Sequence, residues 1–407
     1  MEHKIIAIET RIPEDHMPGL LLVRVHTDSG IVGHGETYYA PHAVAAMIHD
    51  WMARRLLGAD ALAIEAHWRF LYERARSFGA RGTELRALSA LDLCLWDILG
   101  QVCDQPIWKL LGGKVRERIP VYNSCGGSGY GARRGDGPVD QGWPGYGDMG
   151  RPGPLEDHWS SINAPGDLAQ ELLDEGYTAM KMWPLDRAAH KTNGLYIDQE
   201  ELKQAVAPLF TIRERVGTKI EIILDGHGFF SLPAALRIAE AVQDARLLWL
   251  EDILRVDCVD TLVDFRRKTR TPVAVSEMFS SIEEFRLLAE KRGTDYVMID
   301  PTWVGGISQT VRIARMAEAY NIPVLMHDCT GPLTLLAGLQ VATSLSNVLY
   351  QETIRAHIRT FYKDLIDEPI IVQSGSIAPP LRPGLGAKLN PDLFERNNPA
   401  YRLSGQC

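Results

Sequence analysis

The sequence has few cysteines, no long apolar stretch and no sustained run of basic residues. Its six cysteines are scattered, with no CxxC spacing and no zinc pattern of cysteines with histidines, which favours reduced thiols. No apolar run approaches the length of a membrane span, and the first ten residues lack the apolar core of a signal peptide. With 52 acidic against 43 basic residues and no basic stripe, a nucleic-acid partner is disfavoured. We therefore expect a cytoplasmic protein that binds neither a membrane nor a nucleic acid.

The sequence also lacks a GxGxxG motif after a predicted strand, which disfavours an open, doubly wound sheet. From residue 119 onward it instead repeats one unit, a short apolar run that ends in a polar residue, a loop and an amphipathic helix. Eight apolar runs predict strands at 119–123, 179–183, 220–225, 247–251, 272–277, 296–300, 323–327 and 348–352. The helical patterns lie at 168–175, 199–216, 233–245, 259–268, 282–291, 308–320 and 333–344, and Ser281 with Glu284 predicts a capping box. Eight strand–helix repeats predict a TIM-like (β/α)-barrel over 119–369.

The regions on either side of the barrel have a different pattern. Residues 1–118 carry strand patterns at 20–25 and 31–36 and a helical pattern at 87–99, which predict a separate α+β capping domain. The tail, 370–407, is rich in proline and glycine, and we expect it to pack back on that domain. Within the barrel, 126–153 contains eleven glycines and follows the first strand, which places it at the mouth. An active-site cover is favoured there over a mobile insert.

Three carboxylates end consecutive predicted strands at a constant spacing of 26 residues: Asp225, Glu251 and Glu277. Because active sites of such barrels lie at the carboxyl ends of the strands, all three side chains should project into one mouth. Three convergent carboxylates repel one another unless a cation neutralises them, and oxygen ligands suit Mg²⁺ rather than Zn²⁺. Each carboxylate taken alone could instead be a helix cap or an ion-pair partner. Taken together, they predict a magnesium site.

The next three strands also end in polar residues, namely Asp300, His327 and Glu352. A histidine beside a carboxylate is typical of an oriented base, although a structural histidine is the alternative. Glu352 could be a second base or, when protonated, a hydrogen-bond donor to the substrate. His227 lies two residues after Asp225, on the same side of the chain.

The second strand contributes a lysine and a tryptophan. Lys181 lies in an internal strand, where a surface lysine is not expected, and Trp183 follows two residues later. Packing at the rim and contact with the substrate are equally compatible with Trp183. Further candidate substrate contacts are Tyr130, Arg133, Arg134 and Trp143 in the glycine-rich segment and His16 in the first domain. An arginine in that segment could bind a distal carboxylate of the substrate.

The whole set resembles the enolase superfamily, mandelate racemase subgroup. The resemblance rests on residues 87–98 with 110–113, on 383–386, and on the strand-end set just described. It implies Mg²⁺ held by Asp225, Glu251 and Glu277, and a metal-stabilised enediolate made from a small-molecule carboxylate. It also implies that His327, oriented by Asp300, is the base, and that Glu352 hydrogen-bonds the enediolate. Relatives are commonly oligomers, so a homo-oligomer is expected.

The sequence departs from the resemblance at one position. Lys181 matches the first lysine of the family's Lys-x-Lys motif, but Trp183 stands at the second, and a tryptophan is neither acid nor base. The prediction of a racemase is therefore disfavoured. His227 resembles the acid of sugar-acid dehydratases, so the pattern favours a hydro-lyase that converts an acid sugar (an aldonate or aldarate) to a 2-keto-3-deoxy acid. The alternatives are an epimerase or lactone cycloisomerase using Lys181 and His327, and a metal-binding regulatory protein without catalysis.

Overall fold

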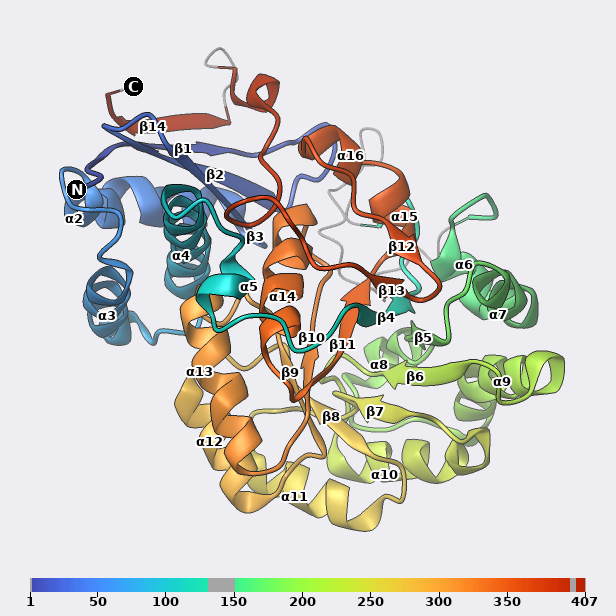
Figure 1. Cartoon of the computed structure of the whole chain (residues 1–407). Coiled ribbons are helices and arrows are strands. Elements are labelled where there is room, and N and C mark those ends of the chain that lie inside the picture. The colour runs from blue at the N-terminus through green and yellow to red at the C-terminus, as the bar shows by residue number, and fades with distance from the viewer. Residues whose placement is uncertain (1, 131–150, 396–399, 407) are drawn as a thin grey trace.

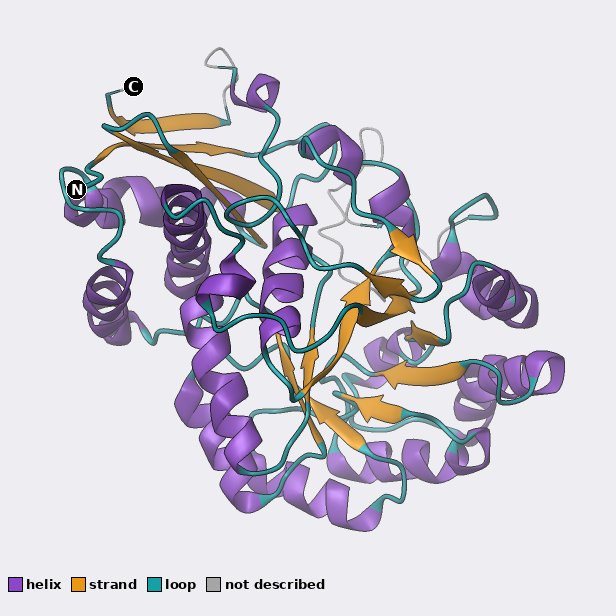
Figure 2. Ribbon diagram, in the orientation of Figure 1, coloured by secondary structure: helices purple, strands orange, loops and turns teal. Residues whose placement is uncertain are grey.

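The fold consists of a barrel and a smaller antiparallel sheet with its own helices (Figures 1 and 2). The computed structural model describes residues 2–130, 151–395 and 400–406. The barrel is built from the strands between Ile119 and Thr353, and the smaller sheet, called the capping part below, is built from segments at both ends of the chain. The predicted glycine-rich cover, 126–153, lies mostly outside the described residues, as do Arg133, Arg134 and Trp143.

Eight parallel strands form the barrel, and pairing of the last strand with the first closes it. This confirms the predicted barrel. The strands in order are β4 (Ile119–Ser124), β5 (Ala179–Met182), β6 (Glu221–Asp225), β7 (Trp249–Glu251), β8 (Val273–Val275), β9 (Tyr296–Ile299), β10 (Val324–Met326) and β11 (Val348–Thr353). Several strands are shorter than their apolar runs suggest. Trp183, Asp300 and His327 therefore lie one residue beyond a strand, and Glu277 lies two residues beyond β8.

A ring of helices covers the outside of the barrel (Figure 2). The predicted helices are α7 (Pro165–Asp174), α9 (Gln199–Val216), α10 (Leu232–Ala241), α11 (Val259–Lys268), α12 (Ile282–Lys291), α13 (Gly306–Ala319) and α14 (Pro332–Ser344). The capping box of α12 is present, with Ser281 and Glu284 satisfying each other's backbone N–H groups. The short helices α6 (Asp157–Asn163), α8 (Asp186–Thr192), α15 (Arg355–Arg359) and α16 (Tyr362–Leu365) were not predicted.

Side chains fill the barrel on both sides of the sheet. Outward-facing aliphatic residues and the helices form one large core, as strands that are covered on both faces require. Inside the barrel, seven buried side chains form a separate plug: Tyr122, Ala179, Ile223, Trp249, Ala274, Met298 and Leu325. The polar strand ends sit above this plug, which seals the site from below.

The second sheet is antiparallel, in the order β14 (Tyr401–Gly405), β1 (Ile5–Arg11), β2 (Leu20–Thr27) and β3 (Val32–Tyr38). Strand β14 pairs with β1, so the tail completes this sheet as predicted. The strand β1 was not predicted, because its apolar residues alternate with polar ones only weakly. Another part of the tail, β12 (Val372–Gln373) and β13 (Ser376–Ile377), lies against barrel strand β4 instead.

Helix α4 (Thr83–Val102) joins the two parts. It packs closely on β3 because Gly33 and Gly35 carry no side chain; a Cβ at either position would lie 2.2 Å from a carbonyl oxygen of α4. Its carboxylates hold the other segments. Asp92 accepts hydrogen bonds from the backbone and hydroxyl of Ser308 in α13, and Asp97 accepts one from the backbone of Leu385.

The remaining helices belong mostly to the capping part. They are α1 (Pro41–Ala46), a π-helix (Met47–Met52), α2 (Ala53–Leu56), α3 (Ile64–Ala75) and α5 (Ile107–Leu110), together with short 3-10 helices at Arg76–Phe78, Gln243–Ala245 and Pro391–Phe394. Among the described residues, no helix is both long and apolar enough to span a bilayer.

Candidate active site

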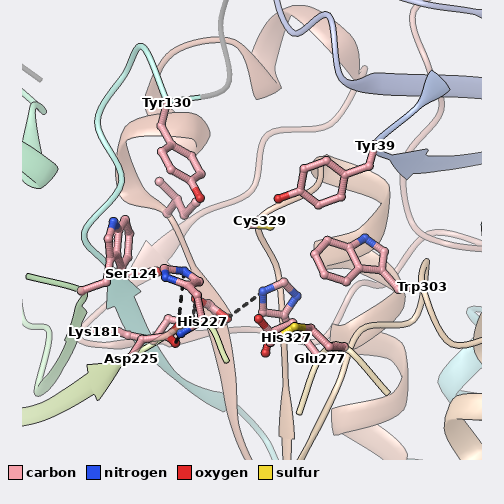
Figure 3. A pocket seen from close by; sticks show the side chains of 14 residues that line it. Tyr39, Ser124, Tyr130, Lys181, Asp225, His227, Glu277, Trp303, His327 and Cys329 are labelled. Atoms are coloured by element: carbon pink, nitrogen blue, oxygen red, sulfur yellow. Dashed lines mark hydrogen bonds and ion pairs between the residues drawn. The ribbon is translucent and has the colours of Figure 1, made fainter. Parts of the chain in front are cut away.

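The carboxyl ends of the barrel strands surround a small chamber of about 30 Å³ (Figure 3). Its walls include most of the predicted site residues, which come from several different strands. They also include Cys329, after β10, and Tyr39, from the capping part. The lining residues are Tyr39, Ser124, Tyr130, Lys181, Trp183, Asp225, His227, Glu277, Met278, Trp303, His327, Cys329, Glu352 and Ile354. The structure therefore brings the predicted strand-end residues to one place.

The ammonium group of Lys181 lies at the centre of the carboxylates. Its Nζ atom is 2.5 Å from Oε1 of Glu251, 2.8 Å from Oε1 of Glu352 and 3.1 Å from Oδ2 of Asp225. All four side chains are buried. The indole N–H of Trp249 donates a further hydrogen bond of 2.8 Å to Glu251. Lys181 is thus a structural counter-ion of the cluster, which explains how several acids are buried together.

The charges of this cluster are strongly coupled. Burial alone would lower the pKa of Lys181, but Glu251 and Glu352 raise it well above its usual range. Burial would raise the pKa of Glu352, whereas Lys181 and His327 lower it. Glu352 is therefore ionised in this arrangement, so of the two possibilities left by the sequence a protonated donor is the less favoured.

The donor set fits a hard divalent cation, although the acids are spread apart as they stand. Among the described residues, no three acidic, histidine or cysteine side chains are close enough together to hold a metal ion. One carboxylate oxygen of Glu277, Oε2, is buried without a hydrogen-bond partner in the described part. Burial and the adjacent Glu277 hold the pKa of Asp252 well above its usual range. This uncompensated acid pair, beside Asp225 and Glu251, is the kind of oxygen environment that Mg²⁺ neutralises.

On one side of the chamber, His327 forms a buried pair with Asp300. The Nδ1 atom of His327 is 2.8 Å from Oδ2 of Asp300, whose other oxygen accepts hydrogen bonds from the backbone and hydroxyl of Thr302. The Nε2 atom of His327 points the other way and is 3.8 Å from Oε2 of Glu352. Asp300 therefore fixes the ring so that Nε2 is the nitrogen available for proton transfer.

A second histidine–aspartate pair lies on the opposite side. The Nδ1 atom of His227 is 2.9 Å from Oδ2 of Asp186, and its Nε2 is 3.8 Å from Asp225. Burial would lower the pKa of His227, but Asp186 and Asp225 raise it to about 10. In the closed strand order, β6 and β10 are four strands apart, so their histidines approach the chamber from opposite sides. One barrel mouth thus carries two oriented imidazoles.

Aromatic rings wall the chamber beside each histidine. Trp183 is buried and packs against His227, with 5.7 Å between ring centroids, and against Tyr130 at 5.9 Å. Near His327, the ring of Trp303 lies 5.0 Å away (Figure 3). Trp183 therefore packs at the rim and also lines the cavity, and its contact with the substrate stays a prediction. His16 lies in the loop between β1 and β2 and is not among the described residues that line the chamber.

Sequence reasoning missed several residues of the site. Asp186 is the first residue of α8, Asp252 and Cys329 lie in loops after strands, and Tyr39 and Trp303 lie directly after β3 and in the loop after β9. For Asp252 there was a signal, because it directly follows a strand-end glutamate. The others carry no periodic pattern, and only the folded chain brings them to the mouth.

Comparison with known proteins identifies two segments. A family model described as "Enolase C-terminal domain-like" matches residues 165–393, more than half of the chain. A second, "Mandelate racemase / muconate lactonizing enzyme, N-terminal domain", matches residues 6–112. The two matches correspond to the barrel and to the capping part.

Similar proteins cover nearly the whole chain. A D-xylonate dehydratase of Haloferax volcanii is 28% identical over 99% of this chain and 90% of its own length. A D-galactonate dehydratase family member of Streptomyces bingchenggensis is 29% identical over 98% of this chain and 94% of its own. Among solved structures, an enolase of the mandelate racemase subgroup from Agrobacterium tumefaciens is 36% identical, with a TM-score of 0.85 and 99% coverage of both chains.

Proposed function

Because the chain belongs to the mandelate racemase subgroup of the enolase superfamily, we propose that it is a hydro-lyase that dehydrates an acid sugar to a 2-keto-3-deoxy acid. The observation that carries the proposal is the pair of histidine–aspartate dyads on opposite sides of the chamber. Elimination of water needs a base at the α-carbon and an acid at the β-hydroxyl, and the two imidazoles supply both. Sugar-acid dehydratases among the relatives support the same reaction class.

Membership of the superfamily implies a divalent metal, typically Mg²⁺. We assign it to Asp225, Glu251 and Glu277. When bound, the metal neutralises the substrate carboxylate and the negative charge that develops on it as the α-proton leaves.

The protein's own residues move the protons. His327 accepts the α-proton on Nε2, since Asp300 engages Nδ1. The electron pair left on the α-carbon forms the double bond and expels the β-hydroxyl, which departs as water with the proton that His227 gives up. The resulting enol takes a proton at the adjacent carbon and becomes the 2-keto-3-deoxy acid, so the net change is the loss of one water molecule.

The position of Lys181 favours dehydration over epimerisation. An epimerase or cycloisomerase of this type would use Lys181 as the base opposite His327. Its ammonium instead lies within 3.1 Å of three carboxylates, which hold it as a cation. A lysine held in this way is poorly suited to accept a proton.

The test is a panel of aldonates and aldarates, incubated with the protein and Mg²⁺ and analysed for 2-keto-3-deoxy products. In deuterated solvent, the α-carbon of unreacted substrate reports proton abstraction separately. His327→Asn should abolish both product and exchange. His227→Asn should lower product formation roughly 10²- to 10⁴-fold while exchange continues.

His42→Asn is the matched control, because His42 is exposed in α1 and should leave both rates unchanged. Exchange without any keto product in the wild type would favour the epimerase or cycloisomerase. Absence of Mg²⁺ binding, or binding that Glu251→Gln does not disturb, would contradict the proposed enzyme function.

A further inference from the structure

A second cavity of about 400 Å³ adjoins the catalytic chamber on the side of His327. The two share four wall residues, namely Tyr39, Glu277, Met278 and Trp303. The catalytic chamber, at about 30 Å³, holds little more than the reacting atoms of a sugar acid, whereas the second cavity has the volume of a small-molecule site. The remainder of a substrate whose α-carbon faces His327 therefore has room in this direction.

One wall of the second cavity carries a cation without a carboxylate partner. Arg86, in the first turns of α4, is half-buried, and its guanidinium stacks on the ring of Trp303 at 4.2 Å and on that of Tyr39 at 5.2 Å. Within the described part of the chain, its one hydrogen bond runs from Nη1 to the carbonyl oxygen of Tyr38, at 3.0 Å, and no acid pairs with it. A stacked guanidinium still presents an edge that matches a carboxylate in a bidentate way.

The other arginine of this cavity is already paired. Arg81 lies 2.5 Å from Oε1 of Glu284, and more than half of its side chain is exposed. The carboxylate of Glu277 also borders the cavity, but it belongs to the proposed metal set and would face the cation there. Arg86 is thus the group on this wall best placed to bind an added anion.

We propose that the second cavity binds the distal end of the substrate and that Arg86 selects a second carboxylate there, so that the substrate class is the sugar diacids (aldarates). This rests on the proposed dehydratase function and narrows it. The tryptophan ring between Arg86 and His327, 5.0 Å from the histidine ring, then separates the group that recognises the substrate from the base.

The experiment compares matched pairs of ligands that differ only at the distal carbon, such as gluconate with glucarate and galactonate with galactarate. Binding is measured by calorimetry with Mg²⁺ on the otherwise complete protein carrying His327→Asn, which prevents turnover. The aldarate should bind at least about tenfold more tightly, the effect of one hydrogen bond between charged groups. Adding Arg86→Gln should remove the difference, and Arg86→Lys should retain part of it.

Arg81→Gln is the matched control, because it removes the same charge from the same wall and should leave the ratio unchanged. Equal or weaker binding of the aldarates by the protein with Arg86 intact overturns the inference without any need for the Arg86 variants. Tighter binding of a phosphorylated aldonate than of the aldarate overturns the assignment to a carboxylate.

Turnover separates the two proposals. If the wild type dehydrates aldonates and aldarates equally well and Arg86→Gln changes neither rate, the subsite is wrong and the dehydratase stands. If no acid sugar is dehydrated but diacid binding still depends on Arg86, the dehydratase is wrong and the subsite stands.

Discussion

Replacement of Lys181 by methionine tests whether its ammonium holds the acidic cluster together in the absence of metal. Like lysine, methionine is unbranched, and its side chain is similar in length, so the substitution removes mainly the charge. Each of the three ion pairs has a gross Coulomb energy of about 5 kcal/mol at a separation near 3 Å and an effective dielectric constant of 20. Desolvation offsets much of this, and removal of one partner of a buried pair costs about 3–5 kcal/mol. We expect Lys181→Met to lose that much unfolding free energy in EDTA.

The loss should depend on pH and on Mg²⁺. Burial raises the pKa of Glu352, and Lys181 is the group that lowers it most. Without Lys181, the pKa of Glu352 in the folded variant should therefore be raised. A carboxyl whose folded pKa lies above its unfolded value contributes stability at low pH and loses it as the pH rises through the folded pKa. The deficit should therefore be smaller near about pH 5 than near about pH 8. Saturating Mg²⁺ should restore roughly 3 kcal/mol at a hundredfold excess over Kd.

The assay is equilibrium urea unfolding followed by circular dichroism, in EDTA and in Mg²⁺. Lys114→Met is the control: Lys114 pairs with Glu117 at 2.6 Å, a similar distance, but both side chains are exposed, so the loss should stay below about 1 kcal/mol. A deficit for Lys181→Met no larger than that of Lys114→Met would refute the reasoning, as would a deficit that grows on acidification.

Three further predictions concern other parts of the molecule. Asp186→Asn should lower the rate of dehydration roughly tenfold or more, with KM and α-deuterium exchange nearly unchanged, because it only misorients His227; Asp186→Glu should recover part of the rate. Gly306→Ala should cost about 1–3 kcal/mol in urea unfolding, since φ is +83° and the new Cβ would lie 2.2 Å from Asp92. Burial lowers the pKa of His34 to about 3, so its neutral form contributes stability that is lost as the pH falls from about 6.5 towards 3; His34→Gln should flatten that part of the pH–stability curve.

The sequence predicts residues that end parallel strands much better than residues in loops. Asp300 and His327 follow neighbouring strands of one sheet, so their pairing at 2.8 Å follows from the repeat alone. Asp186 begins a short helix after β5, in a stretch without periodic pattern, and nothing in the sequence relates it to His227. The same reasoning placed Glu277 at a strand end, although β8 stops two residues earlier, because an apolar run does not mark where hydrogen-bond pairing ends.

Contacts between the capping part and the barrel are harder to predict from the sequence for a different reason. Strand spacing within the barrel is a local property of the chain, but Arg86 reaches Trp303 only because α4 lies close against both β3 and α13. That contact depends on glycines in β3 and on hydrogen bonds that Ser308, more than 200 residues later, donates to Asp92. Arg86, which we propose selects the substrate, is therefore a residue whose position a single sequence does not reveal.

Trp183, the departure from the family's Lys-x-Lys motif, lies beside the His227–Asp186 pair, and the two features are physically related. A lysine there would bring another cation into a wall already next to Lys181 and His227, where like charges repel. The indole instead packs edge-on against the imidazole of His227, with 5.7 Å and 71° between the rings. Asp186 contacts the Nδ1 atom of the same imidazole. A neutral aromatic wall and a carboxylate leave His227 as the cation on that face. In the proposed reaction His327 acts at the α-carbon and His227 at the β-hydroxyl, whereas racemisation requires both groups at the α-carbon.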